Sequence, residues 1–113
     1  MIEVVRSKIP KMTLEKLAQE SFGDMVKGVV DVQKKIIALG GELHADAEEV
    51  LLNHDCQQEN LWGFNIYLNK DKNERLEYTS LINIRPRQGN LDREVQDPQL
   101  CLIMKQIIDA LIE

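Results

Sequence analysis

Side chains that can bind metals or transfer protons recur at every second position in GGELHADAEEVLL, residues 40–52. In a strand, alternate residues share a face, so Glu42, His44, Asp46 and Glu48 would point the same way. A metal site needs two or three such ligands to converge, and no second histidine lies at helical spacing. We therefore predict no metal. Asp46 would cap or turn the backbone, and His44 would be a general base or a hydrogen-bonded structural histidine.

A second polar cluster occupies INIRPRQGN, residues 82–90. Arg85 ends an alternating run, and Pro86 stiffens the exit from it. An arginine presented in this way suits a carboxylate or phosphate through two parallel hydrogen bonds. Pairing with Glu77 or Asp92 at the surface is the commoner outcome for such a residue. The chain contains no Walker loop, no dinucleotide-binding glycine motif and no nucleophile elbow.

Two alternating runs, LWGFNIYL (61–68) and LEYTSLINIRP (76–86), predict a β-hairpin. The apolar positions would face helices, and Asn65, Asn83 and Arg85 would then point the other way. Asparagine is disfavoured in the middle of a strand, so the presence of these two asparagines requires an explanation. A solvated outer face is favoured, because antiparallel sheets commonly leave one face in water. The alternatives are a ligand pocket or a second copy of the chain, which Gly63 would allow to approach the backbone.

Other segments complete the expected architecture. Residues 2–5 read as a strand, a helix begins after Thr13, and 25–39 forms a second helix with a wide apolar arc. Residues 48–53 fit a strand or a short helix, and the strand is favoured. Asp97 and Pro98 start a final helix with a stripe of Ile, Leu and Met. These elements give the order β-α-α-β-β-β-α, an α+β fold whose three- to four-stranded sheet is mainly antiparallel and carries helices on one face.

The composition limits the classes of partner. A chain of 113 residues indicates a single domain, residues 1–113. The net charge of −5 argues against binding nucleic-acid phosphates or an anionic membrane surface. No segment reaches the roughly 18 apolar residues of a membrane span. Cys56 and Cys101 lie in unrelated contexts, which predicts reduced thiols and a cytoplasmic protein. We expect no cofactor.

The motifs FGDMVK, GGELHADAE, LWGFNIY and INIRPRQGN resemble a family of small prokaryotic proteins that is classed as a domain of unknown function. The resemblance covers roughly residues 13–100 and implies a bacterial or archaeal intracellular protein. It implies no activity. Members of that family often carry a Gly-Ser turn where this chain has Asp55 and Cys56. The expected order of elements is also similar to that of ribosome-dependent endoribonuclease toxins, which are typically basic, unlike this chain.

We therefore predict a small binding or regulatory module, which binds a small anionic ligand or a protein partner on the polar sheet face. The candidate ligand-binding residues are His44, Asp46, Asn65, Asn83 and Arg85. The alternative is a metal-assisted hydrolase or ribonuclease-like enzyme that uses the segment of His44 and Asp46. We also predict a twofold homodimer, because strand 61–68 or strand 2–5 would expose an open edge and the last helix has a broad apolar stripe.

Overall fold

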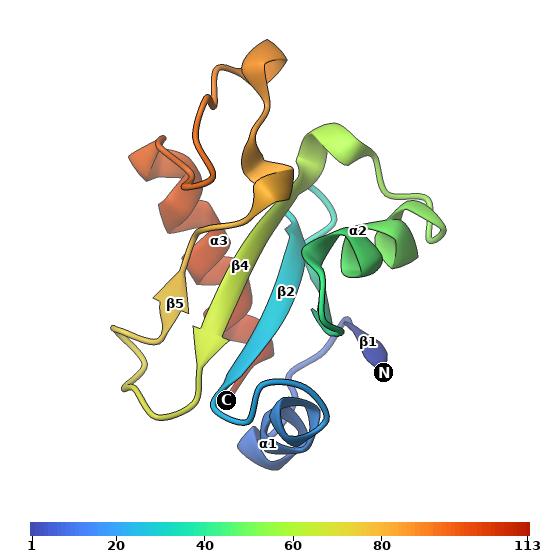
Figure 1. Cartoon of the computed structure of the whole chain (residues 1–113), viewed down its shortest axis with the longest axis vertical. Helices are drawn as coiled ribbons and strands as arrows, with labels where there is room; N and C mark the ends of the chain where they lie inside the picture. Colours follow the sequence, from blue (N-terminus) through green and yellow to red (C-terminus); the bar gives the residue numbers. More distant parts are fainter.

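The computed structural model describes residues 1–113 as a five-stranded sheet with three helices (Figure 1). The elements are β1 (Ile2–Val5), α1 (Lys11–Gln19), β2 (Met25–Asp31), β3 (Ile36–Gly40), α2 (His44–Leu52), β4 (Leu61–Tyr67), β5 (Leu76–Glu77) and α3 (Pro98–Leu111). The strands lie in the order β1-β3-β2-β4-β5, and every neighbouring pair is antiparallel. The α+β class is confirmed, but the order is β-α-β-β-α-β-β-α and the sheet has five strands. None of the three α-helices combines the length and the apolar composition of a membrane-spanning segment.

The helix predicted for residues 25–39 is wrong, because this segment forms the β2–β3 hairpin. The carboxylate oxygen Oδ1 of Asp31 accepts hydrogen bonds from the N–H groups of Gln33 at 2.9 Å and Lys34 at 2.8 Å. Lys35 completes the turn with a left-handed backbone, φ 58°. Strands buried on both faces are apolar at nearly every position, so their periodicity imitates the wide apolar arc of a buried helix.

The strand predicted for residues 48–53 is also wrong, because α2 extends through Leu52. Its buried residues Ala47 and Leu51 pack on the sheet beside Val29 and Ala38. The strand predicted for residues 2–5 is confirmed as β1, and the sheet gains β2 and β3 and loses the strand expected after the glycine pair. The first helix begins at Lys11 behind Pro10, and Thr13 does not cap it.

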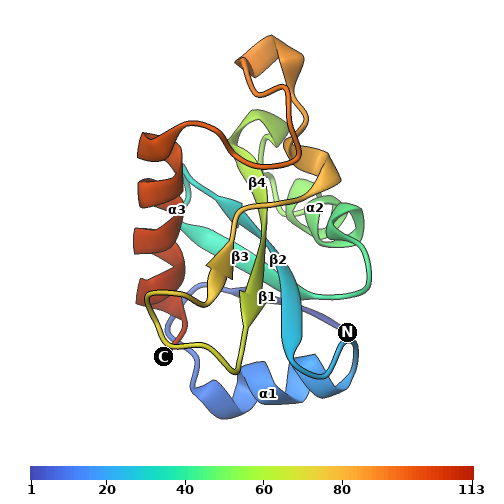
Figure 2. The ribbon, with the colours of Figure 1, turned by 60° about the vertical axis from the view of Figure 1, so that its left-hand side comes forward.

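Helices cover both faces of the sheet, not one face as predicted (Figure 2). On one side, α1 and α3 enclose the larger core, with Val26, Val30, Phe64 and Ile66 contributed by the central strands. On the other side, α2 covers a smaller apolar cluster. The alternation predicted for β4 is confirmed, since Phe64 and Ile66 lie in the larger core and Asn65 does not. The second face is thus part core and part polar surface.

The run predicted as a strand over 76–86 ends at Glu77. Residues 78–97 leave the sheet as a loop that contains 3₁₀ turns at Leu81–Asn83 and Pro86–Gln88. Backbone hydrogen bonds tie this loop to itself, from the N–H of Val95 to the carbonyl of Tyr78 and from the N–H of Ser80 to that of Arg93. The loop then enters α3, where Asp97 accepts a hydrogen bond from Gln99 N–H, as the sequence predicted.

Candidate functional site

Asn83 is fully buried and completes the hydrogen bonding of β4. Its Oδ1 accepts from the N–H of Gly63 at 2.8 Å, and its Nδ2 donates to the Gly63 carbonyl at 3.0 Å. A Cβ at Gly63 would lie 2.5 Å from the Cβ of Ser80. The loop that follows β5 therefore makes the close approach that Gly63 permits. β5 ends at Glu77, too early to pair with Gly63, and the side chain of Asn83 forms the hydrogen bonds that a strand would form there.

Arg85 is held by protein acceptors on all sides. Its five N–H groups donate to oxygen atoms of Ile82, Gln58, Gln88, Glu48 and Leu61. Its guanidinium also lies 4.9 Å from the ring centroid of Trp62, within cation–π range. Because a guanidinium has five N–H donors in total, Arg85 has none left for an anionic ligand. It joins α2, the start of β4 and the loop.

His44 opens α2 and is 9% exposed. Its Nε2 donates to the carbonyl oxygen of Phe64 at 2.9 Å, which leaves Nδ1 as the acceptor nitrogen of a neutral ring. No group of the chain bonds to Nδ1. Burial lowers the pKa of His44 and Lys27 lowers it further, while the Phe64 carbonyl, Asn65 and Glu77 act in the opposite direction. The ring is therefore neutral at pH 7.

Asn65 lies beside His44 and is 7% exposed. Its Nδ2 donates to Glu77 Oε1 at 2.8 Å and to the Thr79 carbonyl at 3.3 Å. Its Oδ1 is buried and has no hydrogen-bond partner. Most buried polar atoms are paired, so an unpaired one beside a cavity indicates a place for a donor from outside the chain.

A cavity of about 420 Å³ lies over these two residues, between the start of α2, strands β2 and β4, and the loop after β5. We call it the His44 cavity; its lining includes Lys27, Leu43, Asn65, Thr79 and Arg93. Leu43 occupies the N-cap position of α2 and forms no capping hydrogen bond. The first N–H groups of α2 therefore keep the partial positive charge that a capping oxygen would normally neutralise.

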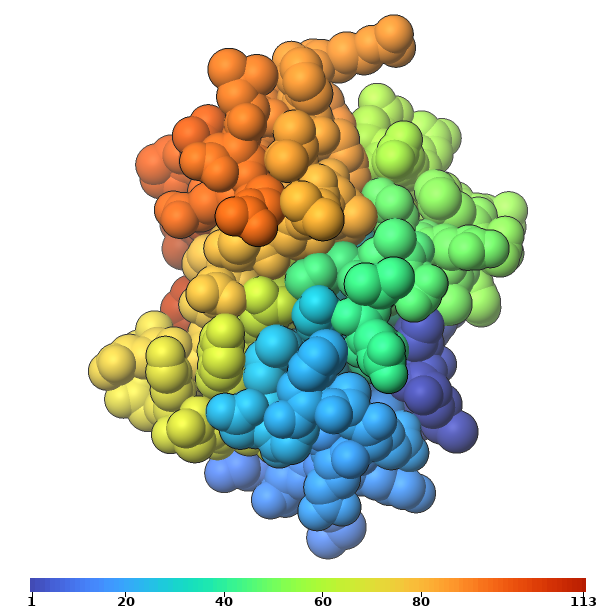
Figure 3. Space-filling model, in the orientation of Figure 1, coloured from blue at the N-terminus to red at the C-terminus, as the bar shows by residue number.

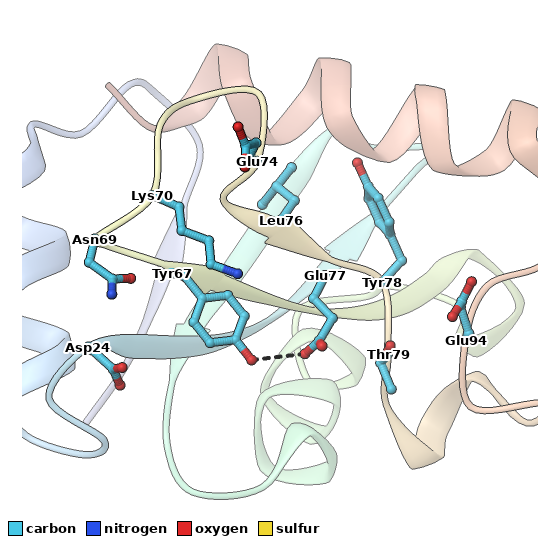
Figure 4. A pocket seen from close by; sticks show the side chains of 10 residues that line it. All are labelled: Asp24, Tyr67, Asn69, Lys70, Glu74, Leu76, Glu77, Tyr78, Thr79 and Glu94. Carbon is cyan, nitrogen blue, oxygen red and sulfur yellow. Dashed lines mark hydrogen bonds between the residues drawn. The ribbon is translucent and has the colours of Figure 1, made fainter.

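A second cavity of about 560 Å³ lies around β5 (Figure 4) and shares Thr79 with the His44 cavity. Its charged lining consists of Asp24, Glu74, Glu77, Glu94 and Lys70. The hydroxyl of Tyr67 donates to Glu77 Oε1 at 3.1 Å, and Thr79 borders both cavities. The segments that surround the two cavities lie side by side on the face shown in Figure 3. The combined surface is cationic near α2 and anionic beyond β5.

The structure brings together two of the five predicted site residues, His44 and Asn65. Asp46 is exposed on α2 and does not line the cavity. Asn83 and Arg85 are held by the loop and by β4. No group of three or more His, Cys, Asp or Glu side chains is arranged to hold a metal ion.

Sequence reasoning missed Lys27 and Glu77, which flank Asn65 on neighbouring strands. Lys27 was assigned to a helix, and Glu77 was treated only as a surface partner for Arg85. A usable signal was present, because β-branched residues dominate the segment from Val26 to Ile37 and favour strands. Reading Lys27 as a strand residue would have placed it on one face of the sheet.

Residues 3–111 match a family model, DUF5674, described as a protein of unknown function. The chain belongs to the DUF5674 family. This confirms the resemblance to a domain of unknown function. No curated protein and no solved structure matches the chain significantly. Membership of DUF5674 brings no activity with it, so a function must be argued from the cavity.

Proposed function

We propose that this protein is a binding module for a small anionic ligand and that the ligand occupies the His44 cavity. The observation that carries the proposal is a cavity that brings two cationic side chains, Lys27 and Arg93, and the uncapped start of α2 together with Asn65, whose buried Oδ1 has no partner. Leaving a buried polar atom unpaired costs free energy, and a ligand that donates to it recovers that cost. These groups also distinguish the cavity from an ordinary surface hollow.

The preference for an anion comes from the cationic groups of the same cavity. Lys27 and Arg93 line it, and neither forms an ion pair within 4 Å. The first turn of α2 has no capping side chain and adds a partial positive charge at its backbone N–H groups, which the exposed Asp46 in the same turn partly offsets. A carboxylate or phosphate there would gain hydrogen bonds from backbone N–H groups as well as charge attraction. The chain's net charge of −5 opposes the approach of anions elsewhere on the surface, so attraction for an anion must come from this local positive region.

The alternative, a metal-assisted hydrolase or ribonuclease-like enzyme, has less support. It needed Glu42, His44 and Asp46 on one face of an extended strand, but the backbone becomes helical at His44. In the helix His44 is buried and Asp46 is exposed, so the three side chains do not converge. His44 retains a neutral ring with a free nitrogen, which is compatible with binding and with proton transfer alike.

The test is a thermal-shift and calorimetric titration with sodium acetate, sodium phosphate and 4-methylpentanoate at constant ionic strength. At least one of these anions should raise the melting temperature and saturate. Lys27→Met, which keeps the apolar stem, should abolish the effect, whereas Lys8→Met at an exposed site without ion pairs should not. Equal responses of both variants, or no saturable binding of any anion, would remove the proposal.

A further inference from the structure

We infer that the ligand of the His44 cavity is a small zwitterion, an amino acid with an apolar side chain. Its carboxylate would lie at Lys27 and the first turn of α2, and its ammonium group would lie between Asn65 and Glu77. The inference rests on the proposed function and narrows it. It predicts two separate charge requirements, whereas an anion site has one.

The register of the sheet places a positive and a negative side chain on the same face. Lys27 on β2 pairs with Asn65 on β4, and Asn65 pairs with Glu77 on β5. Directly paired residues point to the same face, so these three side chains form one row across the sheet. Neighbouring strands are about 4.8 Å apart, so the backbones of Lys27 and Glu77 are separated by about 10 Å. The row thus presents a cation at one end, a carboxylate at the other and a buried amide between them.

The acceptors match an ammonium group better than they match a second anion. An ammonium group has three N–H donors and no acceptor. Two acceptors belong to residues that line the cavity, Asn65 Oδ1 and His44 Nδ1, and the carboxylate of Glu77, which lines the adjacent cavity, is the third. Hydrogen bonds from Asn65 Nδ2 at 2.8 Å and the Tyr67 hydroxyl at 3.1 Å orient this carboxylate. A carboxylate ligand without the amine would leave the buried acceptor Asn65 Oδ1 unpaired.

The exposed apolar side chains that line the His44 cavity indicate that the ligand is apolar in part. Leu43 and Leu81 line the cavity and are 58% and 70% exposed, and Ile82 lies beside them. Large apolar side chains this exposed recover free energy when a ligand covers them. A cavity of about 420 Å³ is at the small end of ligand pockets. It suits a molecule the size of leucine.

The first experiment compares three ligands by calorimetry: L-leucine, 4-methylpentanoate, which lacks the amine, and 3-methylbutylamine, which lacks the carboxylate. L-leucine should bind at least about tenfold more tightly than either fragment, because each charged group forms its own hydrogen bonds. If 4-methylpentanoate binds as tightly as L-leucine, the zwitterion inference is overturned and the anion site stands. If 3-methylbutylamine matches L-leucine, the inference is likewise overturned. If none of the three binds, and acetate and phosphate also fail, both proposals fall.

Two variants separate the charge requirements. Glu77→Gln should weaken L-leucine about tenfold and leave 4-methylpentanoate unchanged, since only the ammonium group contacts that carboxylate. Lys27→Met should weaken both ligands. Glu15→Gln, an exposed residue of α1 that forms no hydrogen bond or ion pair, is the matched control and should change neither affinity. Circular dichroism melting of each variant checks that the fold is retained, and equal weakening of both ligands by Glu77→Gln would contradict the assignment.

Discussion

Asn83 forms both of its backbone hydrogen bonds to β4 through one residue, Gly63, while Asn65 leaves its amide oxygen without a partner. Asn65 sits in β4, where a strand would prefer a β-branched residue, and Asn83 sits in the 3₁₀ turn Leu81–Asn83. The first is accounted for by the chain itself, because it replaces a missing strand. The second donates to Glu77 and Thr79, but its oxygen has no partner in the chain. That difference is why Asn65 belongs to the proposed site and Asn83 to the scaffold.

Replacing Arg85 tests whether it is part of the scaffold. Its side chain is 11% exposed, and every N–H group is used. Arg85→Ala should lower the free energy of unfolding by about 3 kcal/mol, because the buried carboxylate of Glu48 and several carbonyls lose their donor. Arg85→Lys should recover little of this, since a lysine cannot donate in five fixed directions. Urea denaturation measures both variants; a loss below about 0.5 kcal/mol would assign Arg85 to the surface instead.

His44 should make stability depend on pH. Its pKa is lowered on folding, mainly by burial, so the unfolded chain binds more protons than the folded one below the ordinary histidine pKa of about 6.5. Stability should therefore fall as the pH drops from about 6.5 toward the folded pKa and level off below that value. Lys27 and Glu77 are the charged groups that act on the ring.

The measurement is urea denaturation across pH 4–8 for the native protein and for His44→Gln. The native curve should lose stability on acidification more steeply than the variant's curve. His54→Gln is the matched control, because His54 is exposed. Parallel curves for the native protein and His44→Gln would mean that the ring is not responsible.

At the scale of elements, the β2–β3 hairpin depends on Asp31. This residue is fully buried, and its Oδ1 accepts two backbone N–H groups of the turn. Asp31→Ala should lower the free energy of unfolding by about 2 kcal/mol, because two turn donors lose their acceptor. Chemical denaturation gives the value. Asp71, whose Oδ1 accepts two N–H groups in an exposed turn, is the matched site, and Asp71→Ala should cost less.

The β2–β3 hairpin also explains why some elements were predicted correctly from the sequence and others were not. The alternation of β4 and the Asp97 cap of α3 were predicted correctly, because each depends on neighbours in the sequence. The segment 25–39 was misread because burial on both faces removes the period-two signal. Once that segment is a hairpin, Lys27 joins the row of Asn65. The cationic residue of the row was therefore hidden because one element was assigned to the wrong class.

At the scale of the molecule, self-association stays a prediction. The open edge expected for strand 61–68 is wrong, because β4 lies between β2 and β5, but β1 pairs only with β3. On α3, Leu102 and Ile103 are 50% and 43% exposed. Light scattering at high micromolar concentration should show a dimer, and Ile103→Lys should shift it to monomer, because a buried lysine disfavours an apolar interface. Gln99→Lys is the control, and a monomeric native protein would contradict the prediction.

A cytoplasmic location and a prokaryotic source likewise remain predictions.

The structure adds a reason to treat the loop of residues 78–97 as part of the scaffold. Its Asn90 side chain donates to the carbonyls of Asn83, Asp92 and Glu94 and accepts from the N–H of Gln96. A loop tied in this way holds Thr79 and Leu81 at the cavity, so the site should be largely formed before any ligand arrives.

Trp62, the only tryptophan, is 4% exposed and points to the face of β4 opposite Asn65. Its fluorescence comes from a single chromophore stacked near the Arg85 guanidinium. Denaturation should therefore move the emission to longer wavelength in one step, as the indole meets water. Filling the cavity on the other side of the sheet should leave the spectrum unchanged. The protein thus carries an intrinsic optical probe of folding that does not respond to occupancy, which allows stability and binding to be recorded independently in the same sample.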